Sequence, residues 1–234
     1  MIEPLQYFYN KNNIRANDIK KLIIGEKYLA ILLKNGNIGV CSTLNNKIDF
    51  RIDDFSKIDF NNINHRIAAC AYFNAINNYN NKYNYEIDIF DEIDFKKYNN
   101  IIMIGFFRSL VNKFEKENIN LTIFDKIEVH PLLTCMNKQI ESVKKADAVV
   151  LSGTTIFNKT FLNIINNTNN NCDVFLLGPS NILNKDMFNY KNIKFVFGSV
   201  FANYDNNVLN IIENNGGTKD FLPYMKKVYI QNDI

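Results

Sequence analysis

A short polar segment stands out at residues 151–161, with the sequence Leu-Ser-Gly-Thr-Thr-Ile-Phe-Asn-Lys-Thr-Phe. It directly follows an apolar run and contains hydroxyl and amide side chains at Thr154, Thr155, Asn158 and Thr160. These groups donate and accept hydrogen bonds, but none of them is a strong base or nucleophile. Unpaired N–H groups at the start of a helix attract carboxylates and phosphates. The segment therefore predicts a loop that binds a small anionic group.

A purely local interpretation of the same residues stays open. Thr155 could be the N-cap of the following helix, with Asn158 three residues later reaching back as in a capping box. Capping would explain two of the four polar side chains. It would leave Thr154 and Thr160 without a role.

The sequence Gly-Pro-Ser-Asn repeats this arrangement after the next apolar run. Gly178 allows a sharp turn, Pro179 fixes φ, and Ser180 adds a hydroxyl group. A plain turn explains these residues equally well. If the two preceding strands are neighbours, we expect both loops to open into one shared pocket.

Asp125 lies twenty positions after Gly105, the spacing at which an acidic residue contacts a ribose in dinucleotide-binding folds. The bulky Phe106 and Phe107 stand where a GxGxxG motif lets a pyrophosphate approach closely. The standard NAD fingerprint is therefore absent. An adenosine-containing ligand such as S-adenosylmethionine, with Asp125 on its ribose, remains an alternative.

Residues for catalysis or for direct metal binding are few. His65 and His130 are the only histidines, and neither is adjacent to a nucleophile. No CxxC motif or Cys/His pair links the four cysteines, which are Cys41, Cys70, Cys135 and Cys172. The sequence thus indicates neither a zinc site nor a disulfide framework, and it leaves open whether the protein is an enzyme.

The elements that position these residues change in character along the chain. Two β-rich runs over residues 27–44 flank Asn35-Gly36, a strong hairpin signal. Residues 63–79 are apolar almost all round at helical period, which predicts a helix between two layers. Asn74 lies on its apolar stripe, where it either ties down a loop or faces a cleft.

Beyond residue 98, short apolar strands alternate with amphipathic helices, which predicts a Rossmann-like parallel sheet covered on both faces. The expected strands are 101–106, 120–125, 147–152, 173–179 and 193–199, with helices to about 117 and over 134–145, 156–166 and 205–213. Ligands bind such sheets beyond the carboxyl ends of the strands. The residues at those ends include Gly105, Asp125, Gly153 and Gly178.

Composition restricts the class of partner. The net charge of +3 is spread over 234 residues without a basic block, which argues against nucleic acid. No run approaches the roughly 18 to 20 apolar residues that span a bilayer, and the first residues lack an apolar signal region. We therefore expect a cytoplasmic protein with a small-molecule partner and no membrane partner. The sequence leaves a homo-oligomer open.

Several segments together resemble a family of unknown function that is associated with heavy-metal chelation. They are YLAILLKNGNIGVCSTL, FNAINN, IIMIGFF, TIFD, ADAVVLSGTTIFNKTF, LLGPSNIL, FVFGSVF and NNGGTKDF, in the order of the family. The resemblance implies an enolase-N-terminal-like α+β domain over residues 1–97 and a Rossmann-like domain over residues 98–234. It also implies a ligand site in the cleft between them.

Residues that match the cleft segments of the family are Asn74, Gly105, Phe106, Thr154, Thr155, Asn158, Thr160, Gly178 and Pro179. Two positions depart from the family: Asp125 stands where Glu is common, and Lys159 where Gly is common. Soft metals prefer thiolate or imidazole, whereas these segments offer hydroxyls, amides and one carboxylate. We therefore expect a small anionic ligand or a metal already held by a chelator. A transferase that uses S-adenosylmethionine is the alternative.

Overall fold

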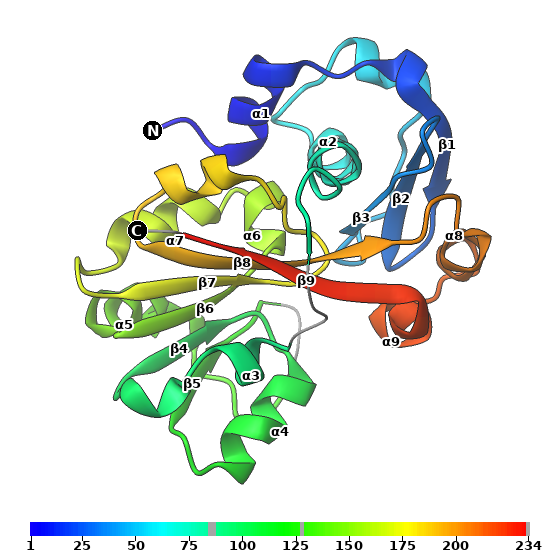
Figure 1. Cartoon of the computed structure of the whole chain (residues 1–234). Helices are drawn as coiled ribbons and strands as arrows, with labels where there is room; N and C mark the ends of the chain where they lie inside the picture. Colours follow the sequence, from blue (N-terminus) through cyan, green and yellow to red (C-terminus); the bar gives the residue numbers. More distant parts are fainter. Residues whose placement is uncertain (84–87, 127–128, 233–234) are drawn as a thin grey trace.

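The computed structural model describes residues 1–83, 88–126 and 129–232. It contains a three-stranded antiparallel sheet and a six-stranded, mostly parallel sheet (Figure 1). The strands are β1 (Ile19–Ile24), β2 (Tyr28–Leu33), β3 (Ile38–Ser42), β4 (Ile101–Ile104), β5 (Leu121–Phe124), β6 (Ala148–Ser152), β7 (Asp173–Leu177), β8 (Ile193–Phe201) and β9 (Met225–Gln231).

The helices are α1 (Pro4–Asn12), α2 (Ile63–Asn77), α3 (Ile89–Glu92), α4 (Arg108–Lys116), α5 (Gln139–Lys145), α6 (Thr154–Phe157), α7 (Phe161–Asn167), α8 (Asn206–Glu213) and α9 (Thr218–Phe221). Short 3₁₀ helices occur at Ala16–Asp18, Ile52–Ser56, Phe95–Lys97, Met136–Lys138, Lys185–Asn189 and Leu222–Tyr224.

The small sheet has the order β1-β2-β3 and includes the predicted hairpin. Leu32 pairs with Ile38 across the turn, and Gly36 has a φ of 94°. A positive φ is the conformation that this turn requires and that glycine adopts without steric strain.

The large sheet has the order β5-β4-β6-β7-β8-β9, with β9 antiparallel to β8. The chain passes from β4 to β5 on one side and then returns to place β6 on the other side of β4. The loops that leave β4 and β6 therefore diverge at a topological switch point, where open α/β sheets bind ligands.

Helices cover both faces of this sheet, as the continuous apolar strands predict. Ile102 and Ile104 pack in the cluster that includes α2, α5, α6 and α7 residues. Ile101 and Met103 point to the opposite face, toward α3 and α4. The predicted Rossmann-like α/β fold is thereby confirmed.

Helix α2 lies between the two sheets (Figure 1). It packs on β2 and β3 from one side and on α6 from the other. Its predicted position between two layers is confirmed. An α2 residue accordingly can contact both the small sheet and the loops of the large one.

The outer face of the small sheet is covered by α8 and α9, which come from the C-terminal part of the chain. Val208, Leu209 and Ile212 of α8 pack against Ala30 and Leu32 of β2. The two parts of the chain thus interlock, and their division between residues 97 and 98 stays a prediction. So does the likeness of the first part to an enolase N-terminal domain.

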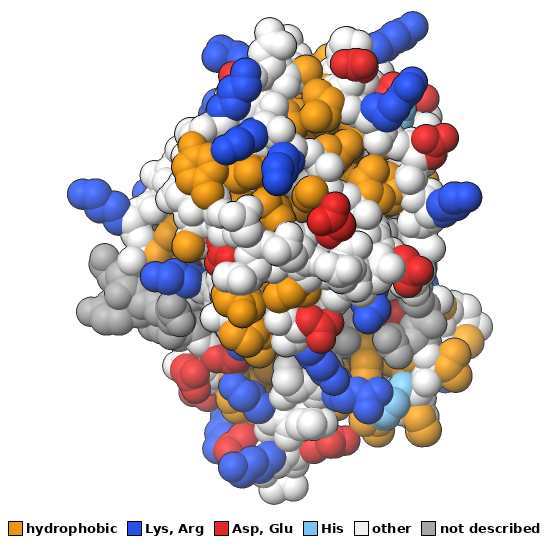
Figure 2. All heavy atoms as spheres, turned by 90° about the vertical axis from the view of Figure 1, so that its right-hand side faces the viewer, with side chains coloured by type: hydrophobic (Ala, Val, Ile, Leu, Met, Phe, Trp, Pro, Cys, Tyr) orange, Lys and Arg blue, Asp and Glu red, His pale blue; other side chains and the backbone are white. Residues whose placement is uncertain are grey.

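The face formed by β1, α8 and α9 carries apolar side chains among lysines (Figure 2). Exposed members of this set are Ile24, Tyr204, Leu222 and Tyr224. The Lys20 Nζ atom lies 4.7 Å from the centroid of the Tyr204 ring, over one face of that ring. No helix in the described ranges is long and apolar enough to cross a membrane.

Candidate functional site

A cavity of about 60 Å³ lies at the carboxyl ends of β4, β5 and β6, at the switch point. It is lined by Leu44, Ile104, Gly105, Phe124, Asp125, Lys126, Met136, Gln139, Ser152, Thr154, Thr155, Asn158, Thr160 and Ile164. Leu44 comes from the first 97 residues and the others come from the large sheet and its loops. Six of the twelve residues singled out from the sequence meet here.

Gln139 is a cavity residue that the sequence did not reveal. Its exposed fraction is only 9 %, and its side chain makes no hydrogen bond to another described residue. Its amide atoms are not among the fully buried, unpartnered polar atoms of the described chain, which belong to Asn74, Asn181 and Ser199. Its amide is therefore free to bind water or a ligand within the cavity. Its place on the cavity wall makes this amide a candidate ligand contact.

The threonines after β6 differ in what they present to the cavity. The Thr155 hydroxyl donates to the carbonyl of Ser152 at 2.7 Å. The Thr154 and Ser152 hydroxyls lie 2.9 Å apart. Gly153, and not Thr155, is the N-cap of α6. The interpretation of Thr155 and Asn158 as a capping box is therefore wrong.

Asn158 ends α6, and the expected continuous helix over 156–166 is instead two short helices separated at residues 158–160. Its Oδ1 accepts hydrogen bonds from the Thr160 N–H at 3.1 Å and from the Thr160 hydroxyl at 2.6 Å. Among the described residues, its Nδ2 has no partner. Lys159 between them has a φ of 65°, a left-handed conformation that suits the Gly of the family.

Gly105 and Asp125 form the opposite wall. The Asp125 carboxylate accepts a hydrogen bond from the Phe106 N–H at 2.8 Å, which fixes the β4 exit against the β5 exit. Gly105 has a φ of 104°, and a Cβ there would lie 2.7 Å from the Ser152 Cβ. A larger residue would therefore push apart the two strand exits that frame the cavity.

The side chain of Phe106 belongs to a different surface. Its ring lies 4.7 Å from that of His130, centroid to centroid, and the Arg108 guanidinium lies 5.6 Å from its centroid. Phe106 is not among the residues that line the cavity.

Asn74 and the Gly178–Ser180 turn also lie outside the cavity lining. Asn74 Nδ2 donates to the carbonyls of Val40 at 2.9 Å and Pro179 at 3.3 Å. The Ser180 hydroxyl accepts from the Ser42 N–H at 3.0 Å. These side chains tie the turn to α2 and β3.

Gly153 shows how tightly the turns after β6 and β7 pack on each other. Of these two turns, only the one after β6 contributes described residues to the lining of the cavity. A Cβ on Gly153 would lie 2.4 Å from Asn181 Oδ1. The two turns thus pack directly on each other, although their strands are neighbours as expected. The polar residues of the β6 exit face β4 and β5.

Most polar side chains that line the cavity offer oxygen donors to a metal. In the described ranges, no group of three or more His, Cys, Asp or Glu residues could hold an ion. Burial raises the pKa of the Cys41 thiol, and its hydrogen bond with Cys70 raises it further. Both thiols are fully buried, and the raised pKa of Cys41 disfavours a thiolate metal ligand at that position. A bare soft ion therefore does not fit the described residues.

Fold and site geometry place the chain among α/β proteins with a Rossmann-like sheet. The chain belongs to the DUF364 family, whose model, described as "Putative heavy-metal chelation", matches residues 88–231. That match covers more than half of the chain and confirms the resemblance read from its motifs.

Two solved structures of DUF364 proteins with unknown function are similar in fold. The protein from Pyrococcus horikoshii has a TM-score of 0.78 at 19% identity, over 93% of this chain and 95% of that one. The protein from Desulfitobacterium hafniense DCB-2 has a TM-score of 0.74 at 16% identity, over 97% and 98%. At these identities the likeness extends to the fold alone. No curated protein matches the sequence.

Proposed function

We propose that the cavity between the exits of β4, β5 and β6 binds an oxygen-bearing group of a small anion or of a chelated metal. The Gln139 amide, which lies on the cavity wall and makes no hydrogen bond to another described residue, is the observation on which the proposal depends. Asn158 Nδ2 adds a second amide donor on the same wall. Lys126, exposed at the rim, supplies a positive charge for the ligand.

The size of the cavity supports a small group. A volume of about 60 Å³ holds a few non-hydrogen atoms, whereas pockets for drug-sized ligands measure about 300–1,000 Å³. A carboxylate arm of a chelator fits this size, and an adenosine does not. The Asp125 carboxylate is also engaged by the Phe106 N–H. Neither observation favours a transferase that uses S-adenosylmethionine.

The donor chemistry supports a metal complex in preference to a free ion. Hydroxyl and amide groups can donate hydrogen bonds to the oxygens of an organic chelator. They are poor direct ligands for the soft ions that prefer sulfur or imidazole. The protein would accordingly hold the chelator, and the metal would be its cargo.

Citrate, zinc citrate, inorganic phosphate and zinc chloride are suitable probes. We expect citrate or its zinc complex to shift the side-chain amide resonances of Gln139 and Asn158 and to raise the melting temperature. The Gln139→Leu variant should lose this response, because it lacks the amide. A cavity that responds to none of the four probes, or that prefers zinc chloride to zinc citrate, would contradict the proposal.

A further inference from the structure

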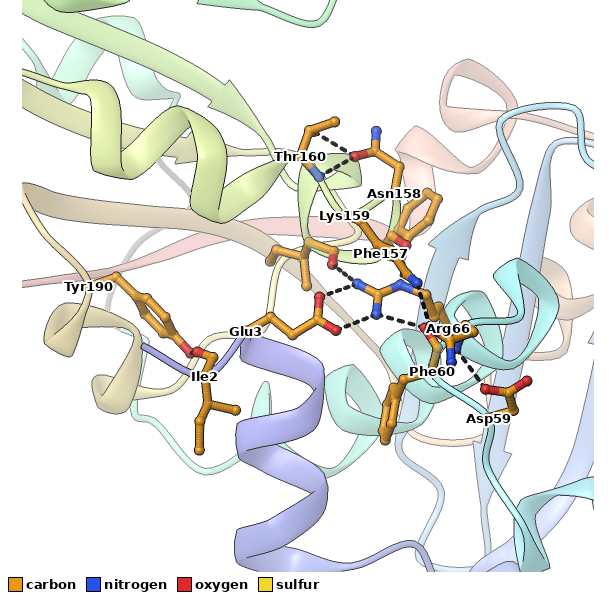
Figure 3. A network of polar contacts seen from close by, with 12 residues as sticks. Ile2, Glu3, Asp59, Phe60, Arg66, Phe157, Asn158, Lys159, Thr160 and Tyr190 are labelled. Atoms are coloured by element: carbon orange, nitrogen blue, oxygen red, sulfur yellow. Dashed lines mark hydrogen bonds and ion pairs between the residues drawn. The ribbon is translucent and has the colours of Figure 1, made fainter.

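Arg66 of α2 is a fully buried cation at the back of the loop that presents Asn158. Its exposed fraction is 0 %. Figure 3 shows its guanidinium enclosed between Glu3, Phe60 and the end of α6. Both terminal nitrogens bond the Glu3 carboxylate at 2.7 Å, and Nη1 also donates to the Phe60 carbonyl at 3.2 Å.

The remaining donors of Arg66 reach the last carbonyls of α6. Nη2 donates to the carbonyl of Ile156 at 2.8 Å, and Nε donates to that of Phe157 at 2.5 Å. Carbonyls in the last turn of a helix lack partners within the helix. Arg66 supplies them from another element.

The Phe157 carbonyl belongs to the peptide group that leads directly into Asn158. Fixing this carbonyl fixes the plane of that peptide and hence the direction in which Asn158 leaves α6. The next residue, Lys159, has a φ of 65°. Because this conformation is unfavourable for a residue with a Cβ, the loop needs contacts from outside to keep its shape.

Neither Arg66 nor any of its hydrogen-bond partners in the described chain is among the residues that line the cavity. In Figure 3, Arg66 contacts the loop from the α2 side, while the Asn158 amide nitrogen points away from Arg66 and Thr160. Glu3 neutralises the buried charge, which would otherwise be strongly unfavourable. The guanidinium thus combines one ion pair with three backbone contacts, and a lysine ammonium cannot reproduce its planar fork.

We propose that Arg66, held by Glu3, is a positioning residue of the cavity, which sets the place of Asn158 Nδ2 for the ligand. This inference rests on the proposed function for its consequence in binding. The structural claim is that Arg66 fixes the position of the Asn158 amide, and it can be tested without a ligand.

The test compares Arg66→Lys with Tyr98→Phe. Tyr98 donates to Asp173 at 2.6 Å at the amino ends of the strands, so its variant weakens the fold away from the cavity. The side-chain amide signal of Asn158, identified by its absence in Asn158→Asp, reports its position. We expect this signal to shift or broaden in Arg66→Lys, with zinc citrate bound about tenfold more weakly. Tyr98→Phe should leave both unchanged.

An unchanged Asn158 signal in folded Arg66→Lys would overturn the inference. If that variant does not fold, Glu3→Gln keeps the acceptor but removes its charge, and we expect a smaller shift of the same signal. An unchanged Asn158 signal in Glu3→Gln would also overturn the inference. If zinc citrate fails to bind the natural sequence, the proposed function fails, while the amide signal still decides whether Arg66 positions Asn158.

Discussion

Two hydrogen bonds from Thr160 fix the orientation of the Asn158 side-chain amide. The Asn158 oxygen accepts from the Thr160 N–H at 3.1 Å, and a backbone N–H can only donate. The atom that faces Thr160 must therefore be the oxygen. The Asn158 nitrogen points away from Thr160 (Figure 3), and Asn158 is one of the residues that line the cavity.

Two substitutions of Asn158 separate folding from binding. Asn158→Ala removes both bonds with Thr160 and should lower the free energy of unfolding by about 1–2 kcal/mol. Asn158→Asp keeps the acceptor and should cost less than about 1 kcal/mol. Both should weaken zinc citrate binding about tenfold or more, because both lack the amide donor. Urea unfolding and calorimetric titration measure the two effects, and normal binding by Asn158→Asp would refute the donor role.

Gln139→Leu should largely preserve stability while it abolishes binding. The substitution keeps the size and helix propensity of the side chain and removes an amide that makes no hydrogen bond to another described residue. We expect the free energy of unfolding to change by less than about 1 kcal/mol. Gln6→Leu on the exposed side of α1 is the matched control and should change stability by less than about 0.5 kcal/mol. A loss above about 1 kcal/mol in Gln139→Leu would mean that the amide is structural.

Periodicity predicted the framework of the fold because the helices and strands depend on local sequence patterns. The Asn35-Gly36 hairpin, the apolar α2 and the alternation from β4 to β8 all follow from neighbouring residues. Strand β9 was missed because only two residues of its seven are buried and its polar positions resemble a loop. It adds an antiparallel edge that local sequence does not indicate.

The cavity was predicted only in part because its residues are far apart in the sequence. They come together only through the order of the strands in the sheet. Thr154 and Asn158 were found from their local cluster. Gln139 was missed because a single glutamine near a helix start has no distinctive pattern, and its burial depends on where β4 and β6 place α5. Arg66 did have a signal, since it is a charge within an otherwise apolar helix. Such a residue requires partners.

Lys159→Gly should stabilise the protein. Lys159 has a φ of 65°, which costs a residue with a Cβ about 1–2 kcal/mol. Glycine avoids this strain but loses more backbone entropy on folding, about 0.5–1 kcal/mol. The Lys159 contact with Asn61 at 3.1 Å is exposed and contributes little. We expect a net gain of about 0.5 kcal/mol in urea unfolding, with no gain in Lys159→Ala, which keeps the strain.

Ionisation of the Cys172 thiol in the unfolded chain should lower the free energy of unfolding at alkaline pH. Burial raises the pKa of its thiol from 9.0 to about 12, and the charges of Asp173 and Asp147 add to this rise. A raised folded-state pKa contributes its full stability below the unfolded pKa, near 8.5 for cysteine. The contribution is lost as the pH rises toward the folded-state pKa, because the unfolded thiol releases its proton first. The free energy of unfolding then falls by up to about 1.4 kcal/mol per pH unit.

The cysteines provide the control for this pH dependence. Cys172→Ala removes the group and should give a flatter decline of stability between pH 9 and pH 11 in urea unfolding. Cys135 is exposed, so Cys135→Ser should keep the slope of the natural sequence. Buried Cys41, whose pKa is also raised by burial, would maintain part of the decline in both variants. An identical slope in Cys172→Ala and the natural sequence would show that the Cys172 thiol ionises alike in the folded and unfolded chains.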